Sequence, residues 1–448
     1  MRSFTILAAF FAAASAAPSV SPRDDGLFTP ASPGGIEDVV VTQENTINGT
    51  YHSAETQVIQ SSDIATRAIS AALPLKFVNN ASNGQVYAYV TGLDSDNKVV
   101  FIKGDGTLVY PSSGGSGAPV ALTQYVSIAL PGQGSTFQLT LPIIVTSGRI
   151  YFAEGKLSFF MVRTGTGGDG VVQPSPTNLK DPSSGTNWGF VEFTYTTDKV
   201  LYANISYVDF VGMILSMSLT VKNGATQTTR GLGAGSVSKI CSGLADQGNS
   251  DKFPWSKMCI ANSAGQPLRA LAPNTYDSIN PADFQNYWSG YVDQVWTSFS
   301  QNPLTIDTQS PAGKVQCKVS GTQLTCAGDN RGYNKPSAHD IWGCNSGPFE
   351  RQSADNDIHV AVIPRLCAAF VRSTLLAAGG NNQPGPESSY YKTNPTHHYS
   401  RLVHQFEVDG KGYAFPYDDV NLDGHNAAGV VSSGSPDTWS IFIGAPPP

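Results

Sequence analysis

The hydrophobic pattern divides the chain into a first half with strand periods and a second half that also carries helical periods. Between about residues 71 and 238, short β-branched and aromatic runs recur, each bounded by Gly, Pro, Asn or Asp. Bounded runs of this kind are typical of a β-sandwich or β-barrel. Examples are QVYAYVTGL, KVVFIKGDGTLVYP, GRIYFAEGKLSFFMV and VLYANISYVDF.

After residue 238, apolar residues also recur at the spacing of a helix. Asn280 and Pro281 are typical of a helix start, and apolar side chains then recur three or four residues apart. We expect this aromatic stripe to pack in a core rather than to bind sugar. A second helix is predicted to start near Pro364 and to end at Gly379, and a strand pair is predicted around residues 409–410. The stripe consists of Phe284, Tyr287, Trp288, Tyr291, Val295 and Phe299.

These periods predict the domain organisation. We expect a β domain over residues 71–238, a mixed α/β domain over residues 239–400, and C-terminal strands over residues 401–448 that return to the β domain. The fold class is therefore mainly β with a mixed α/β part.

The N-terminus is typical of an exported protein. One Arg is followed by an apolar run and then by small residues, which predicts a secretory signal peptide over residues 1–17. The run is too short to span a bilayer, so we expect no membrane anchor. Residues 18–70 are rich in Pro, Ser, Thr and Asp, which predicts a low-order extension or propeptide. The predicted location is extracellular, secreted or associated with a cell wall.

The composition narrows the class of partner. Only 14% of the residues are charged, and the net charge is −7 with 27 Lys and Arg. A surface wetted by Ser, Thr, Asn and Gln suits a secreted protein that handles neutral polymers. No basic stripe is present that could neutralise a phosphate backbone, so nucleic acid is not an expected partner. We expect a monomer without a cofactor.

The six cysteines all lie in the second half of the chain. An even count in an exported chain implies disulfides rather than a metal or nucleophile site. Alternation on both sides of a Ser-Gly turn places Cys317 opposite Cys326 in a hairpin. We expect the other two bridges to be local as well, joining Cys241 to Cys259 and Cys344 to Cys367.

Candidate chemistry lies in residues 190–210, FVEFTYTTDKVLYANISYVDF. Strand alternation places Phe190, Glu192 and Thr194 on one face, and it gives the next strand a polar face that carries Asn204. Asp209 has the opposite parity to Asn204, so a bulge or strand end must lie between them if both face one groove. Two acids among rings and amides could hydrolyse a glycosidic bond. Most carboxylates on strands are merely solvated, so the two acids alone do not establish a catalytic site.

Three motifs add a family resemblance. The runs VEFTY, LYANISYVDFVG and GKGYAFPYDDV resemble glycoside hydrolase family 64, which contains secreted β-1,3-glucanases related to the thaumatin-like fold. The similarity extends from about residue 70 to the C-terminus. It implies a thaumatin-like β-barrel or sandwich domain beside a smaller disulfide-bonded α/β domain, with a wide groove between them.

The resemblance also implies roles for individual residues. Glu192 would be the general acid and Asp209 the general base of an inverting endo-β-1,3-glucanase. We expect burial to raise the pKa of Glu192, and Asp209 to stay ionised. The substrate would be β-1,3-glucan of the laminarin or curdlan type. The expected substrate-binding residues are Thr194, Tyr202, Asn204, Trp188, Tyr207 and Asp419.

Other interpretations stay open at this point. The same rings and amides could hold sugar without cutting it, as in a non-catalytic thaumatin-like glucan-binding or antifungal protein. A protease or esterase is disfavoured because the chain has no G-x-S-x-G elbow. His397, His398 and His404 fit no standard metal spacing, so we expect loop or capping roles and no metal. Of Asp418 and Asp419, which are adjacent, only one can reach a groove, and that carboxylate would line the groove or fix a turn.

Overall fold

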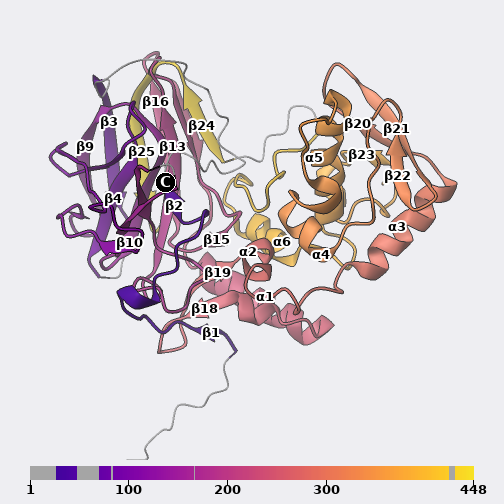
Figure 1. The fold of residues 1–448 in the computed structure, drawn as a ribbon, viewed down its shortest axis with the longest axis horizontal. Coiled ribbons are helices and arrows are strands. Elements are labelled where there is room, and N and C mark those ends of the chain that lie inside the picture. The colour runs from indigo at the N-terminus through magenta and orange to yellow at the C-terminus, as the bar shows by residue number, and fades with distance from the viewer. Residues whose placement is uncertain (1–26, 48–69, 82–83, 166, 423–428, 448) are drawn as a thin grey trace, which may run out of the picture.

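The computed structural model describes residues 27–47, 70–81, 84–165, 167–422 and 429–447. Figure 1 shows a β-rich lobe and a second lobe of helices and short strands, joined by α1, β15, β18 and β19. The predicted signal peptide lies outside the described residues. Within them, no helix is both long and apolar enough to cross a membrane.

Two large sheets form the β-rich lobe. The eight-stranded sheet has the order β24-β14-β13-β10-β4-β5-β6, with β8 also paired to β4, and the five-stranded sheet has the order β17-β16-β25-β3-β9. The first comprises β24 (Val430–Ser433), β14 (Leu201–Asn204), β13 (Trp188–Tyr195), β10 (Val145–Glu154), β4 (Val86–Leu93), β5 (Val99–Ile102), β6 (Leu108–Val109) and β8 (Ile128–Ala129). The second comprises β17 (Thr226–Thr229), β16 (Leu215–Val221), β25 (Pro436–Ile443), β3 (Ser70–Asn79) and β9 (Ser135–Ile143).

The two large sheets pack face to face through aromatic side chains. Phe77 of β3 meets Phe152 of β10 edge-on, with ring centroids 5.2 Å apart, and Phe193 of β13 lies 5.3 Å from Trp439 of β25. Each sheet has a linear strand order with two open edges in the described part of the chain. The lobe is therefore a sandwich, and the closed barrel that the sequence left possible is not found.

Two smaller sheets incorporate residues from the N-terminal segment. β1 (Thr29–Pro30) runs parallel to β18 (Cys259–Ala261), which pairs with β19 (Pro267–Leu271) and, through it, with β15 (Phe210–Val211). β2 (Thr46–Ile47) pairs with β12 (Asp169–Val172), in a sheet with β11 (Phe160–Arg163) and β7 (Val120–Ala121). The expectation of low order over residues 18–70 is therefore wrong for residues 27–47. Their strands are two residues long, too short to leave a hydrophobic period.

The second lobe holds most of the helices and a sheet of order β22-β21-β20-β23. Its strands are β20 (Leu304–Asp307), β21 (Lys314–Ser320), β22 (Gln323–Cys326) and β23 (Asn382–Gln383). The helices are α1 (Ser236–Asp251), α2 (Pro273–Asp277), α3 (Ser289–Gln301), α4 (Ala338–Gly343), α5 (Asp357–Val371) and α6 (His398–Phe406). Short 3-10 turns are η1 (Ile36–Asp38), η2 (Trp255–Met258), η3 (Gly347–Phe349) and η4 (Glu387–Ser389).

Two helix boundaries and one strand pair differ from the sequence prediction. The aromatic stripe is buried, as predicted, but the α-helix begins only at Ser289. α5 begins at Asp357, capped by Asn356, so Pro364 lies inside the helix instead of near its start. The strand pair predicted around residues 409–410 is absent, and only isolated bridges form at Glu407 and Tyr413. Tertiary contacts override local propensity at each of these sites.

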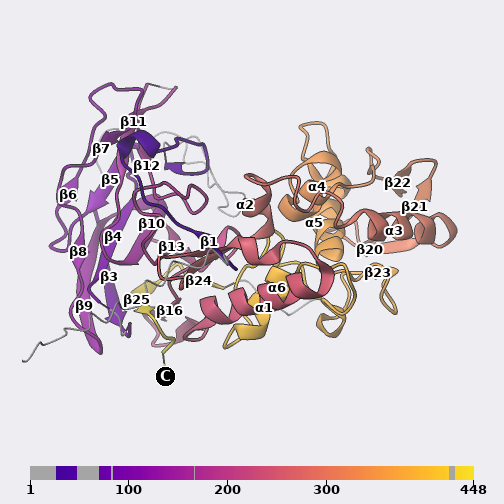
Figure 2. The same ribbon diagram turned by 90° about the horizontal axis from the view of Figure 1, so that it is seen from below.

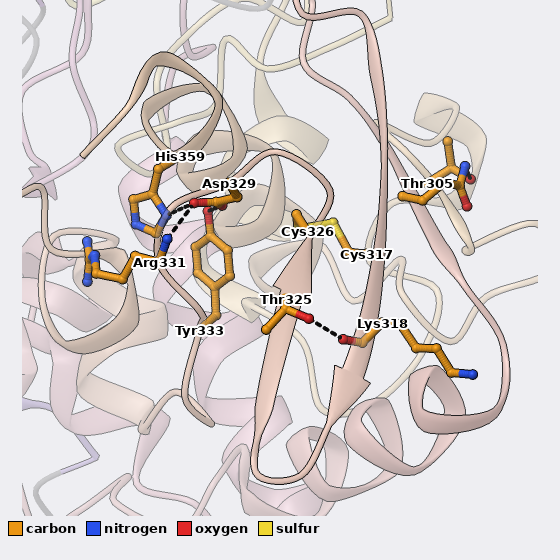
Figure 3. The surroundings of a disulfide bond; sticks show 10 residues. Thr305, Cys317, Lys318, Thr325, Cys326, Asp329, Arg331, Tyr333 and His359 are labelled. Atoms are coloured by element: carbon orange, nitrogen blue, oxygen red, sulfur yellow. Dashed lines mark hydrogen bonds and ion pairs between the residues drawn. A yellow bond between two sulfur atoms is a disulfide. The ribbon is translucent and has the colours of Figure 1, made fainter. Parts of the chain in front are cut away.

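The three predicted disulfides are present. Cys317 and Cys326 lie directly opposite each other in the β21–β22 hairpin (Figure 3). The other bridges join Cys241 to Cys259, from α1 to β18, and Cys344 to Cys367, from the end of α4 to α5. Beside the hairpin, His359 stacks on Tyr333, and both side chains bond the Asp329 carboxylate (Figure 3). The predicted domain boundaries stay predictions, although β24 and β25 do lie in the two large sheets.

Candidate active site

The outer face of β13 presents the first candidate acid. Along β13, Val191 and Phe193 point into the core, while Glu192 and Thr194 are partly exposed on the other face, as the alternation predicts. In the pairing register, Glu192 lies between Arg149 of β10 and Asn204 of β14, and Thr194 lies opposite Tyr202 of β14. Three neighbouring strands therefore place a cation, a carboxylate and an amide in one row.

Asp209 reaches the same region from a separate segment. β14 ends at Asn204, and Asp209 immediately precedes β15, so a strand end does separate the two as the sequence required. The ring of the next residue, Phe210, lies 4.7 Å from that of Trp188 on β13. This contact holds the start of β15 against β13, the strand that carries Glu192. The charges of Arg149 and Glu192 both act on Asp209. The two candidate acids are therefore near enough for their charges to interact.

Arg149 holds Glu192 in place. Its Nε and Nη2 donate to Glu192 Oε1 at 3.1 and 2.8 Å, and its Nη1 donates to Gln173 Oε1 at 3.2 Å. The guanidinium carbon lies 4.4 Å from the centroid of the Phe190 ring. The side chains of Arg149 and Glu192 are only 16% and 18% exposed. Charge-assisted hydrogen bonds in such a setting are stronger than those of an open surface pair.

The electrostatics of Asp209 differ from what the sequence predicted. Its side chain is accessible to water but is surrounded by protein, and this desolvation raises its pKa above the ordinary value. Arg149 opposes the rise, and the negative charge of Glu192 adds to it. Burial likewise raises the pKa of the neighbouring Tyr151 to about 12. Desolvation therefore acts on Asp209, the acid that we expected to stay ionised, while Glu192 faces a guanidinium.

Three of the predicted substrate-binding residues line this open face. Thr194 Oγ1 and Asn204 Oδ1 are buried atoms without a hydrogen-bond partner. Tyr202 lies opposite Thr194 in the strand pair and two residues before Asn204 on β14, and it is 45% exposed. A buried polar atom without a protein partner costs about 1–3 kcal/mol unless another molecule satisfies it. An exposed ring beside them offers a surface for stacking.

Comparison with known proteins identifies the family. Residues 71–443 match the family described as Beta-1,3-glucanase, glycoside hydrolase family 64. The chain belongs to this β-1,3-glucanase family. Both carboxylates of the candidate site lie within the matched region.

Two related sequences carry names that agree with this family assignment. The chain is 29% identical over 385 residues to a glucan endo-1,3-β-glucosidase of Cellulosimicrobium cellulans and to one of Arthrobacter sp. (strain YCWD3). The alignment covers 84% of this chain and 66% of each relative, so the chain spans just under two thirds of their length.

Solved structures show the same fold. A laminaripentaose-producing β-1,3-glucanase in complex with laminaritetraose is 26% identical with a TM-score of 0.70, covering 83% of this chain and 98% of that chain. A β-1,3-glucanase domain from Clostridium beijerinckii is 21% identical with a TM-score of 0.63, covering 85% of this chain and all of that chain.

The remaining predicted substrate residues lie elsewhere. Trp188 is 1% exposed beneath Phe210 and Arg269, and Tyr207 is 5% exposed with its hydroxyl accepting from Leu232 N at 3.1 Å. Both are core residues, so their predicted direct contact with substrate is not supported. Alternation gives the face of a side chain but not what covers that face. Asp419 is partly open to solvent near Arg365, whose charge is not among the causes of the Asp209 shift. The surrounding protein raises the pKa of the Asp419 carboxyl, and Arg365 opposes the rise.

The histidines near the C-terminus have structural roles. His397 caps α6, because its Nδ1 accepts from Ser400 N at 3.1 Å. His404 pairs with Asp418 through Nε2 and with Glu407 through Nδ1, both at 2.8 Å. Asp418 also accepts from Ala414 N at 2.8 Å, so it is the turn-fixing carboxylate of the YDD motif. Among the described residues, no three His, Cys, Asp or Glu side chains form a metal cluster.

Sequence reasoning missed Arg149 and Gln173. Arg149 lies on the same strand face as Tyr151, and opposite charges directly across a strand pair stabilise a sheet, so a correct register would have revealed its pairing with Glu192. Gln173 follows β12, a strand of another sheet, and no sequence signal connects it to Arg149.

Proposed function

We propose that the chain is a secreted, monomeric endo-β-1,3-glucanase of thaumatin-like fold, with Glu192 and Asp209 as its acid/base pair. The observation that carries the proposal is the row of Arg149, Glu192 and Asn204 across three paired strands, on a face that also presents the exposed Tyr202. The charge of Asp209, in the segment before β15, interacts with those of Arg149 and Glu192. The relatives are named glucan endo-1,3-β-glucosidases, and a solved relative holds laminaritetraose. These names support the same substrate class.

The two acids divide the chemistry of an inverting hydrolysis. Glu192 protonates the glycosidic oxygen as the bond to the leaving sugar breaks, and Asp209 takes a proton from the water that attacks the anomeric carbon from the opposite side. Thr194 and Asn204 hydrogen-bond sugar hydroxyls, and Tyr202 stacks on a sugar ring. Inversion requires a carboxyl separation of roughly 6.5–9.5 Å, which leaves room for the water.

Arg149 positions Glu192 for this role. Its guanidinium donates to Glu192 Oε1 and to Gln173 Oε1, and it also lies over the Phe190 ring. These contacts hold the Glu192 carboxyl in a defined orientation on the open face.

Sugar release from two glucans tests the proposed activity. The chain is expected to release reducing ends from a soluble β-1,3-glucan and none from a soluble β-1,4-glucan. The products are expected to include oligosaccharides from the start of the reaction, as internal cleavage requires. Binding to β-1,3-glucan without any release would instead support the non-catalytic glucan-binding alternative.

A further inference from the structure

Helix α2 connects the candidate site to the second lobe. In Figures 1 and 2, α2 lies between the β-rich lobe and α4. Its start is tied to the second candidate acid, because Ala272 N donates to Asp209 O at 2.9 Å. Consecutive Cα atoms are about 3.8 Å apart, so the Cα of Asn274 lies within about 8 Å of that of Ala272. The first turn of α2 is therefore close to the backbone that carries Asp209.

A buried carboxylate at the other end of α2 holds a histidine of α4. His339 Nδ1 lies 2.7 Å from Oδ2 of Asp277, the last residue of α2. The side chain of Asp277 is only 4% exposed, whereas that of His339 is 58% exposed. A carboxylate bonded to one ring nitrogen fixes the orientation of an imidazole, and here it leaves Nε2 towards solvent. This nitrogen can bond a hydroxyl as an acceptor or as a donor.

Two side-chain amides converge beside this histidine. Gly343 follows His339 by four residues, so both lie on one face of α4. A Cβ added at Gly343 would lie 2.7 Å from Asn345 Oδ1 and 2.8 Å from Asn274 Oδ1. The amides of α2 and of the segment after α4 therefore meet over a backbone position that has no side chain.

These groups have the chemistry of a sugar site. Amide and imidazole groups can donate and accept hydrogen bonds, and the hydroxyls of a neutral sugar need both kinds of partner. Within the described residues, the side-chain amides of Asn274 and Asn345 have no hydrogen-bond partner. The side chains of Asn274, Asn345 and His339, here called the α2–α4 cluster, therefore present three polar groups that a ligand can satisfy.

We propose that the α2–α4 cluster is a glucan subsite, at which its amides and imidazole hydrogen-bond the hydroxyls of sugar units beyond the point of cleavage. The inference rests on the proposed action of Glu192 and Asp209 on β-1,3-glucan. Asp277 is a positioning residue, because it holds the ring of His339 and does not itself touch the sugar. Only a chain that extends past the two acids reaches the cluster.

Two variants test the α2–α4 cluster by different routes. His339→Ala removes the imidazole. Gly343→Ala removes no polar group, but its methyl displaces both amides, and the chain can still fold because the displaced atoms are the ends of flexible side chains. Each variant is expected to raise KM for soluble β-1,3-glucan by about 3–10-fold while kcat stays within about 2-fold. Gly290→Ala in α3 is the matched control and should keep the parental KM, because a Cβ there meets no atom within 4 Å.

Binding without turnover separates this inference from the proposed function. In Glu192→Gln, the imidazole NMR signal of His339, identified by its loss in His339→Ala, should shift when a β-1,3-linked hexasaccharide is added. A β-1,4-linked hexasaccharide should leave the signal in place. Parental KM values in His339→Ala and Gly343→Ala, together with an unmoved signal, would overturn the subsite and leave the glucanase assignment intact. If the parent releases no sugar although the signal moves, the proposed cleavage is refuted and the binding site stands.

Discussion

Replacing Arg149 separates its charge from its geometry. Arg149→Gln removes the cation while keeping a donor near Gln173, whereas Arg149→Lys keeps the charge but loses the planar fork that holds Glu192 at 2.8 and 3.1 Å. Both side chains of the ion pair are largely buried, so the charge is poorly screened. The guanidinium is the largest influence that lowers the pKa of Asp209.

The magnitude follows from this position. An opposite charge favours the ionised form of a carboxyl, so loss of the cation should raise the pKa of Asp209. If Asp209 is the base, the acid limb of kcat/KM against pH should move to higher pH in Arg149→Gln, by about 1 unit on the pH axis of the assay. In Arg149→Lys the limb should stay within about 0.3 unit, while kcat falls because Glu192 is no longer fixed.

The assay is the initial rate of reducing-end release from soluble β-1,3-glucan across pH, with urea unfolding to confirm that each variant is folded. An unchanged acid limb in Arg149→Gln would refute the electrostatic account of the site. Movement of the alkaline limb alone would show that Asp209 is the acid and Glu192 the base, which reverses the proposed roles.

Three further predictions follow from the structure. The first sugar product seen by proton NMR should be the α-anomer, and a β-anomer would indicate a retaining nucleophile instead of an inverting base. Thr194→Val and Tyr202→Ala should raise KM by about 5–30-fold, about 1–2 kcal/mol of lost binding each, and unchanged KM values would remove these side chains from the glucan site. Pairing raises the folded-state pKa of His404 from 6.5 to about 10, mainly through Asp418, although burial opposes the rise. Its stabilisation is therefore complete below pH 6.5 and is lost as pH rises towards 10. His404→Gln should flatten the fall of the unfolding temperature between those pH values, and a parental slope in the variant would contradict this.

Residues 190–204 show what a sequence can supply. Alternation of period 2 places Glu192 and Thr194 on the open face, and the sequence also required a strand end between Asn204 and Asp209; the structure has the alternation and the strand end. The local disulfides were predictable for the same reason, because their partners are close in sequence or face each other in a hairpin. Local geometry is sufficient in these cases.

The predictions that were wrong or missing depended on contacts between segments that are distant in the sequence. Trp188 has the parity of Glu192, but Phe210 and Arg269 cover it, and neither contact leaves a mark in the local pattern. The role of Arg149 follows from the register of β10 on β13, and Gln173 reaches Arg149 from another sheet. Residues 27–47 are held by backbone hydrogen bonds and two-residue strands, so composition alone suggested a low-order segment.

The most direct test of the central claim is sugar release by the two shape-preserving variants of the acid pair. Glu192→Gln and Asp209→Asn should each lose about 10²-fold or more in release of reducing ends from soluble β-1,3-glucan, while both still bind insoluble β-1,3-glucan like the parent. Asp198→Asn, in the exposed turn between β13 and β14, is the matched control and should keep parental activity. Near-parental release by both acid variants would contradict the account and leave this face as a binding surface only.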